Sequence, residues 1–359
     1  MHREQGVEVT TELPPSLAAV GARAAQRIAQ LLDAEIERWS RVEPSLAPPL
    51  DALRQLVAVG GKRLRPAFCH WAFVGAGGDP DDALVVDVGA ALELLHTFAL
   101  VHDDVMDGSD RRRGLPAVHR AFIDRHDASR WRGEARRFGE GAAILVGDFA
   151  FIYADQLMAG AAPDARAIFD ELRVELCVGQ YLDLVGTASG ARDAEQARTI
   201  EWYKSGKYTV ERPLHLGAAL AGRYEELAEP LSAFGLPLGE AFQLRDDLLG
   251  AFGDEQVTGK PVGDDLREGK LTPLVAVAAA RLEGPGLALL ERLGSTNLTE
   301  NEIAALGELL LECGAVEEIE RSIVCLVEES LAALEHAPIT EESRHALAEL
   351  GTFVAWRDR

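Results

Sequence analysis

LVHDDVMD, residues Leu100–Asp107, closes an apolar run of helical character that begins near Ala83. Asp103 and Asp107 are four positions apart, so a helix places both on one face about one turn apart. Carboxylates this close repel each other, and the macrodipole also disfavours anions at a helix C-terminus. A cation between them relieves both penalties, and magnesium suits hard oxygen ligands that also hold a phosphate. The alternative is a solvated acidic helix end.

A second stretch repeats this pattern. Residues 242–250, FQLRDDLLG, again bring an apolar helical run to paired aspartates, Asp246 and Asp247. We expect the two aspartate pairs to face each other across a helical bundle and to hold a polyphosphate through magnesium ions.

Two basic stretches supply cations for such an anion. In residues 60–66, GGKRLRP, two glycines precede Lys62, Arg63 and Arg65, which suit charge-assisted hydrogen bonds to a diphosphate. Residues 111–113 are three adjacent arginines, which repel one another unless anions lie near. The alternative for both stretches is solvated basic surface.

Taken together, these motifs resemble those of the trans-isoprenyl diphosphate synthases, and most closely the short-chain enzymes that make geranylgeranyl diphosphate. DDVMD is similar to the first aspartate-rich motif of that family, DDLLG to the second, and GGKRLRP to its isopentenyl diphosphate motif. The resemblance runs from about Gly60 to Thr272. It implies condensation of isopentenyl diphosphate with allylic diphosphates (dimethylallyl, geranyl or farnesyl), with about three magnesium ions per active site.

The resemblance also implies roles for individual residues. Asp103, Asp107 and Asp246 are expected to bind metal. The isopentenyl diphosphate site is expected to contain Lys62, Arg65, His96 and Arg113. The allylic diphosphate site is expected to contain Arg112, Lys204, Ser205, Gln243, Lys260 and Lys270.

The chain departs from the family pattern at two of its motifs. Ser205 replaces the usual threonine after Lys204 and keeps its hydroxyl group. Gly250 stands where the family has a third aspartate, so the second motif has fewer carboxylates, and the roles of Asp247 and Asp254 stay open.

Product length is expected to depend on the helix that leads into Asp103. Ala99 lies four residues before Asp103, about 6 Å deeper, and Leu95 lies about 12 Å deeper on the same face. In the family, one aromatic residue at five back with a small residue at four back usually gives twenty carbons, and Phe98 and Ala99 match that pattern. Geranylgeranyl diphosphate is therefore the expected main product, with farnesyl diphosphate as the alternative. The alternative role of Phe98 is packing between helices.

Composition narrows the class of protein. The chain has 359 residues and a net charge of −23, which disfavours nucleic-acid binding. Its four cysteines form no CxxC pair, no signal peptide is evident, and no uninterrupted apolar run is long enough to span a membrane, so we expect a cytoplasmic protein with reduced thiols.

The expected fold is all-α, as in the family. We expect a loose arm over residues 1–15, followed by a single domain over 16–359 in which ten or more helices surround a deep apolar cavity. Residues 124–140 are polar and weakly periodic and are expected to form a loop. A homodimer is expected from the family. The rival functions are a terpene cyclase, which would lack the isopentenyl motif, and a silent subunit of a heteromeric synthase.

Overall fold

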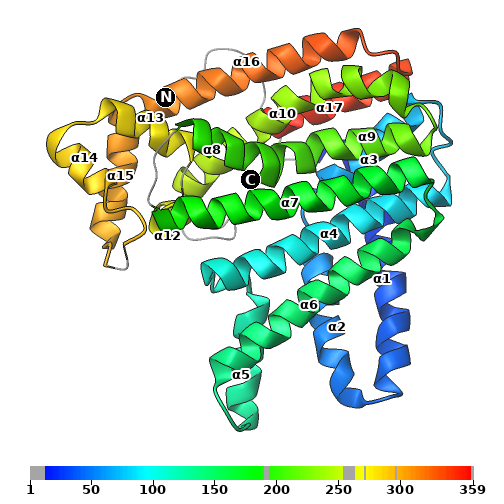
Figure 1. Cartoon of the computed structure of the whole chain (residues 1–359), viewed down its shortest axis with the longest axis horizontal. Coiled ribbons are helices and arrows are strands. Elements are labelled where there is room, and N and C mark those ends of the chain that lie inside the picture. The colour runs from blue at the N-terminus through cyan, green and yellow to red at the C-terminus, as the bar shows by residue number, and fades with distance from the viewer. Residues whose placement is uncertain (1–12, 190–193, 254–262, 271, 296, 357–359) are drawn as a thin grey trace. The chain divides into compact units, whose positions relative to one another are not determined.

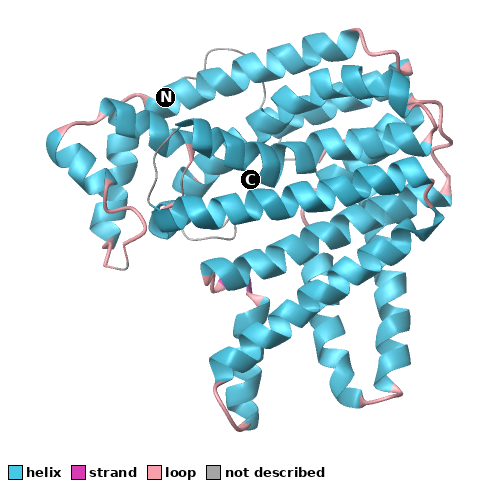
Figure 2. Cartoon of the chain, viewed as in Figure 1, coloured by secondary structure: helices cyan, strands magenta, loops and turns pink. Residues whose placement is uncertain are grey.

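The computed structural model describes residues 13–189, 194–253, 263–270, 272–295 and 297–356. Helices account for nearly all of these residues (Figure 2). The strands of the described part form one short antiparallel hairpin, which pairs Arg111 with Pro116 and Arg112 with Leu115. The expected all-α fold is confirmed.

The chain divides into two compact units, which are described separately. Unit 1 comprises residues 1–16, 170–212 and 226–359, and unit 2 comprises residues 17–169 and 213–225. The single domain expected over residues 16–359 stays a prediction.

Unit 2 contains the first aspartate motif and both basic stretches (Figure 1). Its elements are α1 (Pro15–Ser40), η1 (Pro44–Leu46), α2 (Ala47–Val59), α3 (Leu64–Gly75), α4 (Ala83–Asp107), β1 (Arg111–Arg112), β2 (Leu115–Pro116), α5 (Val118–Ser129), α6 (Ala135–Leu157), η2 (Met158–Gly160) and most of α9 (Arg212–Leu220).

Unit 1 contains the second aspartate motif and the lysines. Its elements are most of α7 (Pro163–Ser189), α8 (Ala194–Glu201), the π-helix η3 (Trp202–Glu211), α10 (Tyr224–Phe252), α12 (Asp264–Glu268), α13 (Pro273–Arg281), α14 (Gly284–Leu290), α15 (Glu300–Glu312), α16 (Ala315–Glu335) and α17 (Glu341–Trp356).

Helix α4 is the central element of unit 2. It begins at the side chain of Asp82, which accepts a hydrogen bond from the Leu84 amide at 2.8 Å, and ends at Gly108, whose φ of 69° is left-handed. It packs against α2, α3 and α6, which cover its apolar faces. The helix therefore carries the aspartates of the first motif on its last turn, as the sequence predicts.

The prediction of a loop over residues 124–140 is wrong. Helix α5 continues to Ser129 and α6 begins at Ala135, so only five residues connect them. The two helices pack so closely that a Cβ atom on Gly139 would lie 2.4 Å from the His119 carbonyl oxygen. The buried side chains of Phe122 and His126, four apart, form the apolar face that the polar composition of the segment conceals.

Two helices are long and apolar enough, by length and composition, to cross a membrane: α4 and the stretch Ala135–Gly160. The most apolar window of α4 is 61% buried, as in the core helix of a soluble protein. The expectation that no apolar segment is long enough to span a membrane is not confirmed, because few polar residues interrupt these two helices. The absence of a membrane span stays a prediction.

Candidate active site

The three aspartates at the end of α4 have different surroundings. Asp104 is 1% exposed, and its Oδ1 atom accepts hydrogen bonds from Nε of Arg112, at 2.8 Å, and from Nη2 of the same guanidinium. Asp103 and Asp107 are partly exposed, and Asp103 lies 3.7 Å from Arg112. Arg112 therefore neutralises the buried carboxylate, while the two carboxylates four residues apart remain on the accessible face of the helix.

Arg111, Arg112 and Arg113 lie on a tight hairpin that follows α4. Strands β1 and β2 are joined by Arg113 and Gly114, whose φ angles of 52° and 77° are both left-handed, as a type I′ turn requires. Arg111 donates a hydrogen bond to the Gly114 carbonyl oxygen at 2.8 Å and so closes the turn. A left-handed arginine is strained, which is typical of functional sites.

The basic cluster, defined as Arg63, Arg65, Arg112 and Arg113, surrounds His96. Burial and the charges of Arg65, Arg113, Arg112 and Arg63, in that order, lower the pKa of His96 well below its usual range. His96 is therefore neutral at pH 7 and offers one hydrogen-bond donor and one acceptor.

The backbone brings these arginines close together. Arg63 has a left-handed φ of 54°, and the guanidinium of Arg113 lies over Gly61, where an added Cβ atom would be 2.5 Å from Nη2. Arg63 lies 3.3 Å from the buried Glu93 carboxylate. Burial lowers the pKa of Arg113, and Glu93 partly opposes that effect. Glu93, Asp103 and Asp104 lie beside this group of four guanidinium groups. Such a concentration of fork-shaped donors suits the oxygens of a diphosphate.

The second aspartate pair, on α10, likewise has one buried and one partly exposed member. Asp247 is buried, and its Oδ1 atom accepts a hydrogen bond from Nε2 of Gln243 at 2.7 Å, whereas Asp246 is partly exposed. Arg245, which immediately precedes the pair, forms two hydrogen bonds of 2.7 Å to Glu320 and one of 2.8 Å to the Ala355 carbonyl oxygen. Gln243 therefore contacts Asp247, and its predicted contact with substrate stays a prediction.

Lys204 and Ser205 lie on η3, and π-helices occur frequently at functional sites. The ammonium group of Lys204 lies 2.5 Å from Asp183, and that of Lys207 lies 2.7 Å from Glu175. Burial acts to raise the pKa of Glu175, but hydrogen bonds from Arg212 and Lys207 outweigh it and lower the pKa. Each lysine is thus oriented by a carboxylate on α7.

Of the two later lysines, the structure describes Lys270. Its ammonium group lies 2.6 Å from Glu268 and 3.4 Å from Asp265. Lys260 and Asp254 lie outside the described residues.

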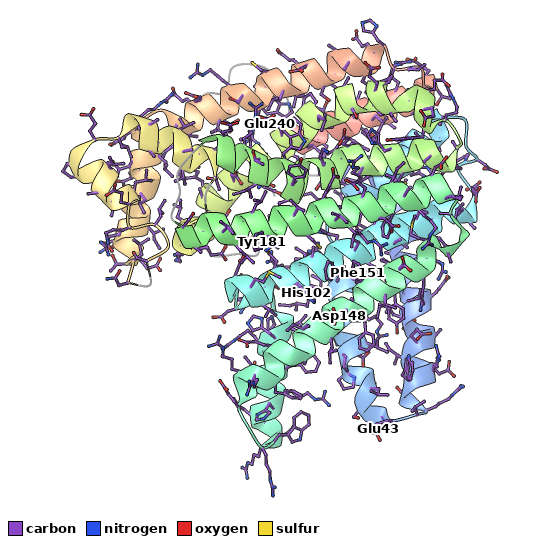
Figure 3. All side chains as sticks on the ribbon, in the orientation of Figure 1. Glu43, His102, Asp148, Phe151, Tyr181 and Glu240 are labelled. Atoms are coloured by element: carbon purple, nitrogen blue, oxygen red, sulfur yellow. The ribbon has the colours of Figure 1, made fainter. Side chains whose placement is uncertain are left out.

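The residues expected to set product length differ in burial. Leu95 is fully buried, while Phe98 and Ala99 are partly buried. The Phe98 ring lies 4.6 Å from the His102 ring and 5.0 Å from the Phe151 ring, centroid to centroid, and Figure 3 labels His102 on α4 and Phe151 on α6. Phe98 therefore contacts α6, and its predicted effect on the product stays a prediction.

Magnesium fits the residues of the first motif. Asp103 and Asp107 offer hard oxygen ligands from one helix face, and a magnesium ion that keeps several waters and bridges to a diphosphate needs only one or two protein carboxylates. Within the described residues, no group of three or more His, Cys, Asp or Glu side chains is placed to enclose a metal ion.

Sequence spacing gives no ion-pair partner for four carboxylates, Glu93, Asp104, Glu175 and Asp183. Each lies close to a basic side chain that comes from a different element, which sequence spacing does not reveal.

The chain matches the family model described as polyprenyl synthetase over residues 49–310. It is 34% identical over 291 residues to a geranylgeranyl diphosphate synthase of Methanosarcina mazei, covering 79% of this chain and 82% of that protein. It is also 34% identical over 276 residues to a nonaprenyl diphosphate synthase of Mycobacterium tuberculosis, covering 77% and 75%.

Solved structures show the same similarity. The structure of a geranylgeranyl pyrophosphate synthase from Corynebacterium glutamicum, complexed with isoprenyl diphosphate and magnesium, matches with a TM-score of 0.90 and 36% identity. The match covers 94% of this chain and 99% of that chain.

Proposed function

The chain belongs to the polyprenyl synthetase family, and we propose that it is a magnesium-dependent prenyltransferase that condenses isopentenyl diphosphate with allylic diphosphates. The basic cluster around His96 carries this proposal. Four guanidinium groups from two segments, two of them in strained conformations, lie beside the first aspartate motif. A terpene cyclase has no use for such a second diphosphate site.

In the proposed reaction, Arg65, Arg113 and His96 bind and orient isopentenyl diphosphate, with Lys62 as a further cation. Arg65, which is 8% exposed, supplies a fork of donors at fixed geometry, and neutral His96 adds a hydrogen bond without a charge. The allylic diphosphate is bound by Arg112, Lys204, Ser205, Lys260 and Lys270.

Magnesium, when bound, supplies charge stabilisation for the departing diphosphate. Asp103, Asp107 and Asp246 would hold it, and we propose three ions per active site. Arg112 and Lys204 add fixed positive charge where negative charge develops. The proton released after the attack passes to the departed diphosphate, so the reaction requires no protein nucleophile.

We propose geranylgeranyl diphosphate as the main product and farnesyl diphosphate as a lesser one. Ala99 leaves space on the helix face of Asp103, and Phe98 follows the family pattern for twenty carbons. The similar Methanosarcina protein is named a geranylgeranyl diphosphate synthase, after the product proposed here. The similar Mycobacterium protein is named a nonaprenyl diphosphate synthase, after a longer product.

We infer that the chain works as a cytoplasmic homodimer. Helix α7 exposes four apolar side chains at spacings of four, three and four residues, as a helix–helix interface requires: Val174, Val178, Tyr181 and Val185. Helix α6 exposes Ile144, Leu145 and Ile152. All four cysteines are free thiols, which suits a reducing compartment. A light-scattering mass near 38.7 kDa at micromolar concentration would contradict the dimer.

The test is incubation of the purified single chain with radiolabelled isopentenyl diphosphate, an allylic diphosphate and magnesium. Chromatography of the dephosphorylated products should show chains of fifteen and twenty carbons, with the twenty-carbon alcohol dominant. Cyclised hydrocarbons in the absence of isopentenyl diphosphate would favour a cyclase. No product from any primer would favour a silent subunit.

A further inference from the structure

The second aspartate motif lacks a carboxylate at position 250, and the structure places another carboxylate there. A Cβ atom added to Gly250 would lie 1.8 Å from Oδ2 and 2.6 Å from Cγ of Asp265. The Asp265 carboxylate therefore occupies the space into which a side chain at position 250 would project. Asp265 is fifteen positions further along the chain, on α12.

The site beside Gly250, which Asp265 occupies, has the same spacing from Asp246 as Asp107 has from Asp103. Residues 246 and 250 lie four apart on α10, about one turn or 6 Å along one helix face, as Asp103 and Asp107 do on α4. Asp246 is partly exposed, and the side chain of Asp265 is 17% exposed, so both carboxylates are accessible.

Helix α12 is held firmly enough to keep Asp265 in place. It begins at Gly263 and ends at Gly269, both with left-handed φ angles, and Gly269 lies against the backbone of Gly294. The side chain of Leu266 is buried, and Arg267 forms a 2.6 Å ion pair with Glu300 on α15. Contacts at its C-terminal end and along one face therefore hold the short helix in place.

We infer that Asp265 replaces the missing carboxylate of the second motif, so that Asp246 and Asp265 together bind one divalent cation. The inference rests on the proposed function, because it concerns a metal of that reaction. Lys270 lies 3.4 Å from Asp265, where it would limit the repulsion between the two carboxylates when no cation is bound.

The experiment measures manganese binding in the presence of inorganic pyrophosphate, from the electron paramagnetic resonance signal of free manganese. Asp265→Asn should weaken manganese binding by at least about tenfold, because it removes a charged ligand but keeps the shape. Glu268→Gln is the matched control, since it removes the other carboxylate beside Lys270, and it should leave manganese binding unchanged.

A swap of the carboxylate between helices sharpens the test. Gly250→Asp alone should weaken binding, because its side chain would collide with Asp265. The double variant Gly250→Asp with Asp265→Ala removes the collision and restores a carboxylate on the same side of α10. It should bind manganese within about threefold of wild type, which is a strong non-additive effect.

Two results would overturn the inference. One is that wild type and Asp265→Asn bind manganese equally well, while the variant has only a raised KM for the allylic substrate. Asp265 would then act only by positioning Lys270. The other is a folded double variant that binds manganese no better than Asp265→Ala. If Gly250→Asp prevents folding, Asp265→Asn still decides the question. The binding assay needs no prenyl substrate, so an enzyme that forms no product would refute the proposed function separately.

Discussion

The two aspartate motifs have similar sequences, but different groups hold their buried carboxylates. In each pair the second aspartate is buried and the first is partly exposed. Asp104 is held by the charged Arg112 from a neighbouring hairpin, whereas Asp247 is held by the neutral Gln243 from its own helix. The two aspartates of each DD pair are therefore not equivalent. One is buried against a neighbouring side chain, and the other is partly exposed.

The largest expected effect tests the exposed aspartates. Asp103→Ala should lower kcat by about a thousandfold, because one carboxylate of the metal clamp is lost while Asp104 still binds Arg112. Circular dichroism should show an unchanged fold. Asp124→Ala, an exposed residue on α5, is the control and should retain full activity. A rate above about a tenth of wild type for Asp103→Ala would remove Asp103 from the metal site.

The next effect separates the two buried aspartates. Asp104→Asn should lower the free energy of unfolding by about 3 kcal/mol, because it removes the nearer and more buried countercharge of Arg112. Asp247→Asn should cost about 1 kcal/mol, because Gln243 is neutral and an amide oxygen still accepts its hydrogen bond. Urea unfolding followed by circular dichroism measures both. Equal losses would show that the charge of the partner does not matter.

Substrate affinity distinguishes Lys62 and Arg65, assigned to isopentenyl diphosphate, from Lys204, assigned to the allylic diphosphate. Lys62→Ala and Arg65→Ala should each raise the KM for isopentenyl diphosphate about tenfold and leave that for the allylic substrate nearly unchanged. Lys204→Ala should show the opposite pattern. Arg54→Ala, exposed on α2, is the control. Equal changes for both substrates would refute the assigned division of sites.

The next expected effect is a change in the length of the product, which can occur without a change in the reaction rate. Ala99→Phe should shift the main product from twenty to fifteen carbons, since it fills the face below Asp103. Phe98→Ala should lengthen the product, and Phe151→Ala should do the same if the ring contact of 5.0 Å holds Phe98 in place. Chromatography of the dephosphorylated products measures all three. If Ala99→Phe leaves the distribution unchanged, another helix sets the limit.

The smallest expected effect comes from pH. The folded chain keeps His96 neutral, because burial and the neighbouring arginines lower its pKa, whereas the unfolded chain protonates histidine near 6.5. The contribution of His96 to the free energy of unfolding is therefore complete above about pH 6.5 and falls as the pH drops below it. His96→Gln should reduce this fall, measured by urea unfolding at about pH 5.5 and 7.5. His70, whose pKa burial lowers to about 4, accounts for part of the remaining slope.

The sequence predicts the helices and the motif residues well, because both depend on local spacing. The buried positions Leu17, Gly21, Ala24, Ile28 and Leu32 recur at helical intervals, and α1 forms where that pattern lies. The end of α4 at Gly108 likewise follows from a local signal.

Other features could not be predicted, because distant contacts determine them. The polar composition of residues 124–140 conceals a helix pair that close packing at Gly139 stabilises. The partner of Asp104 comes from a hairpin eight residues later, and that of Lys204 from a helix 21 residues earlier. The space at Gly250 is filled by Asp265, which lies fifteen residues further along the chain.

The glycines around Lys204 have a mechanical consequence. A Cβ atom on Gly179 would lie 2.4 Å from the Lys204 amide nitrogen, and one on Gly239 would lie 2.6 Å from the Gly206 carbonyl oxygen. At both places η3 touches its neighbours through backbone atoms, which have no rotamers to absorb a displacement. A shift of α10 would therefore carry η3 with it, so the backbones of Asp246 and Lys204 should move as parts of one rigid block.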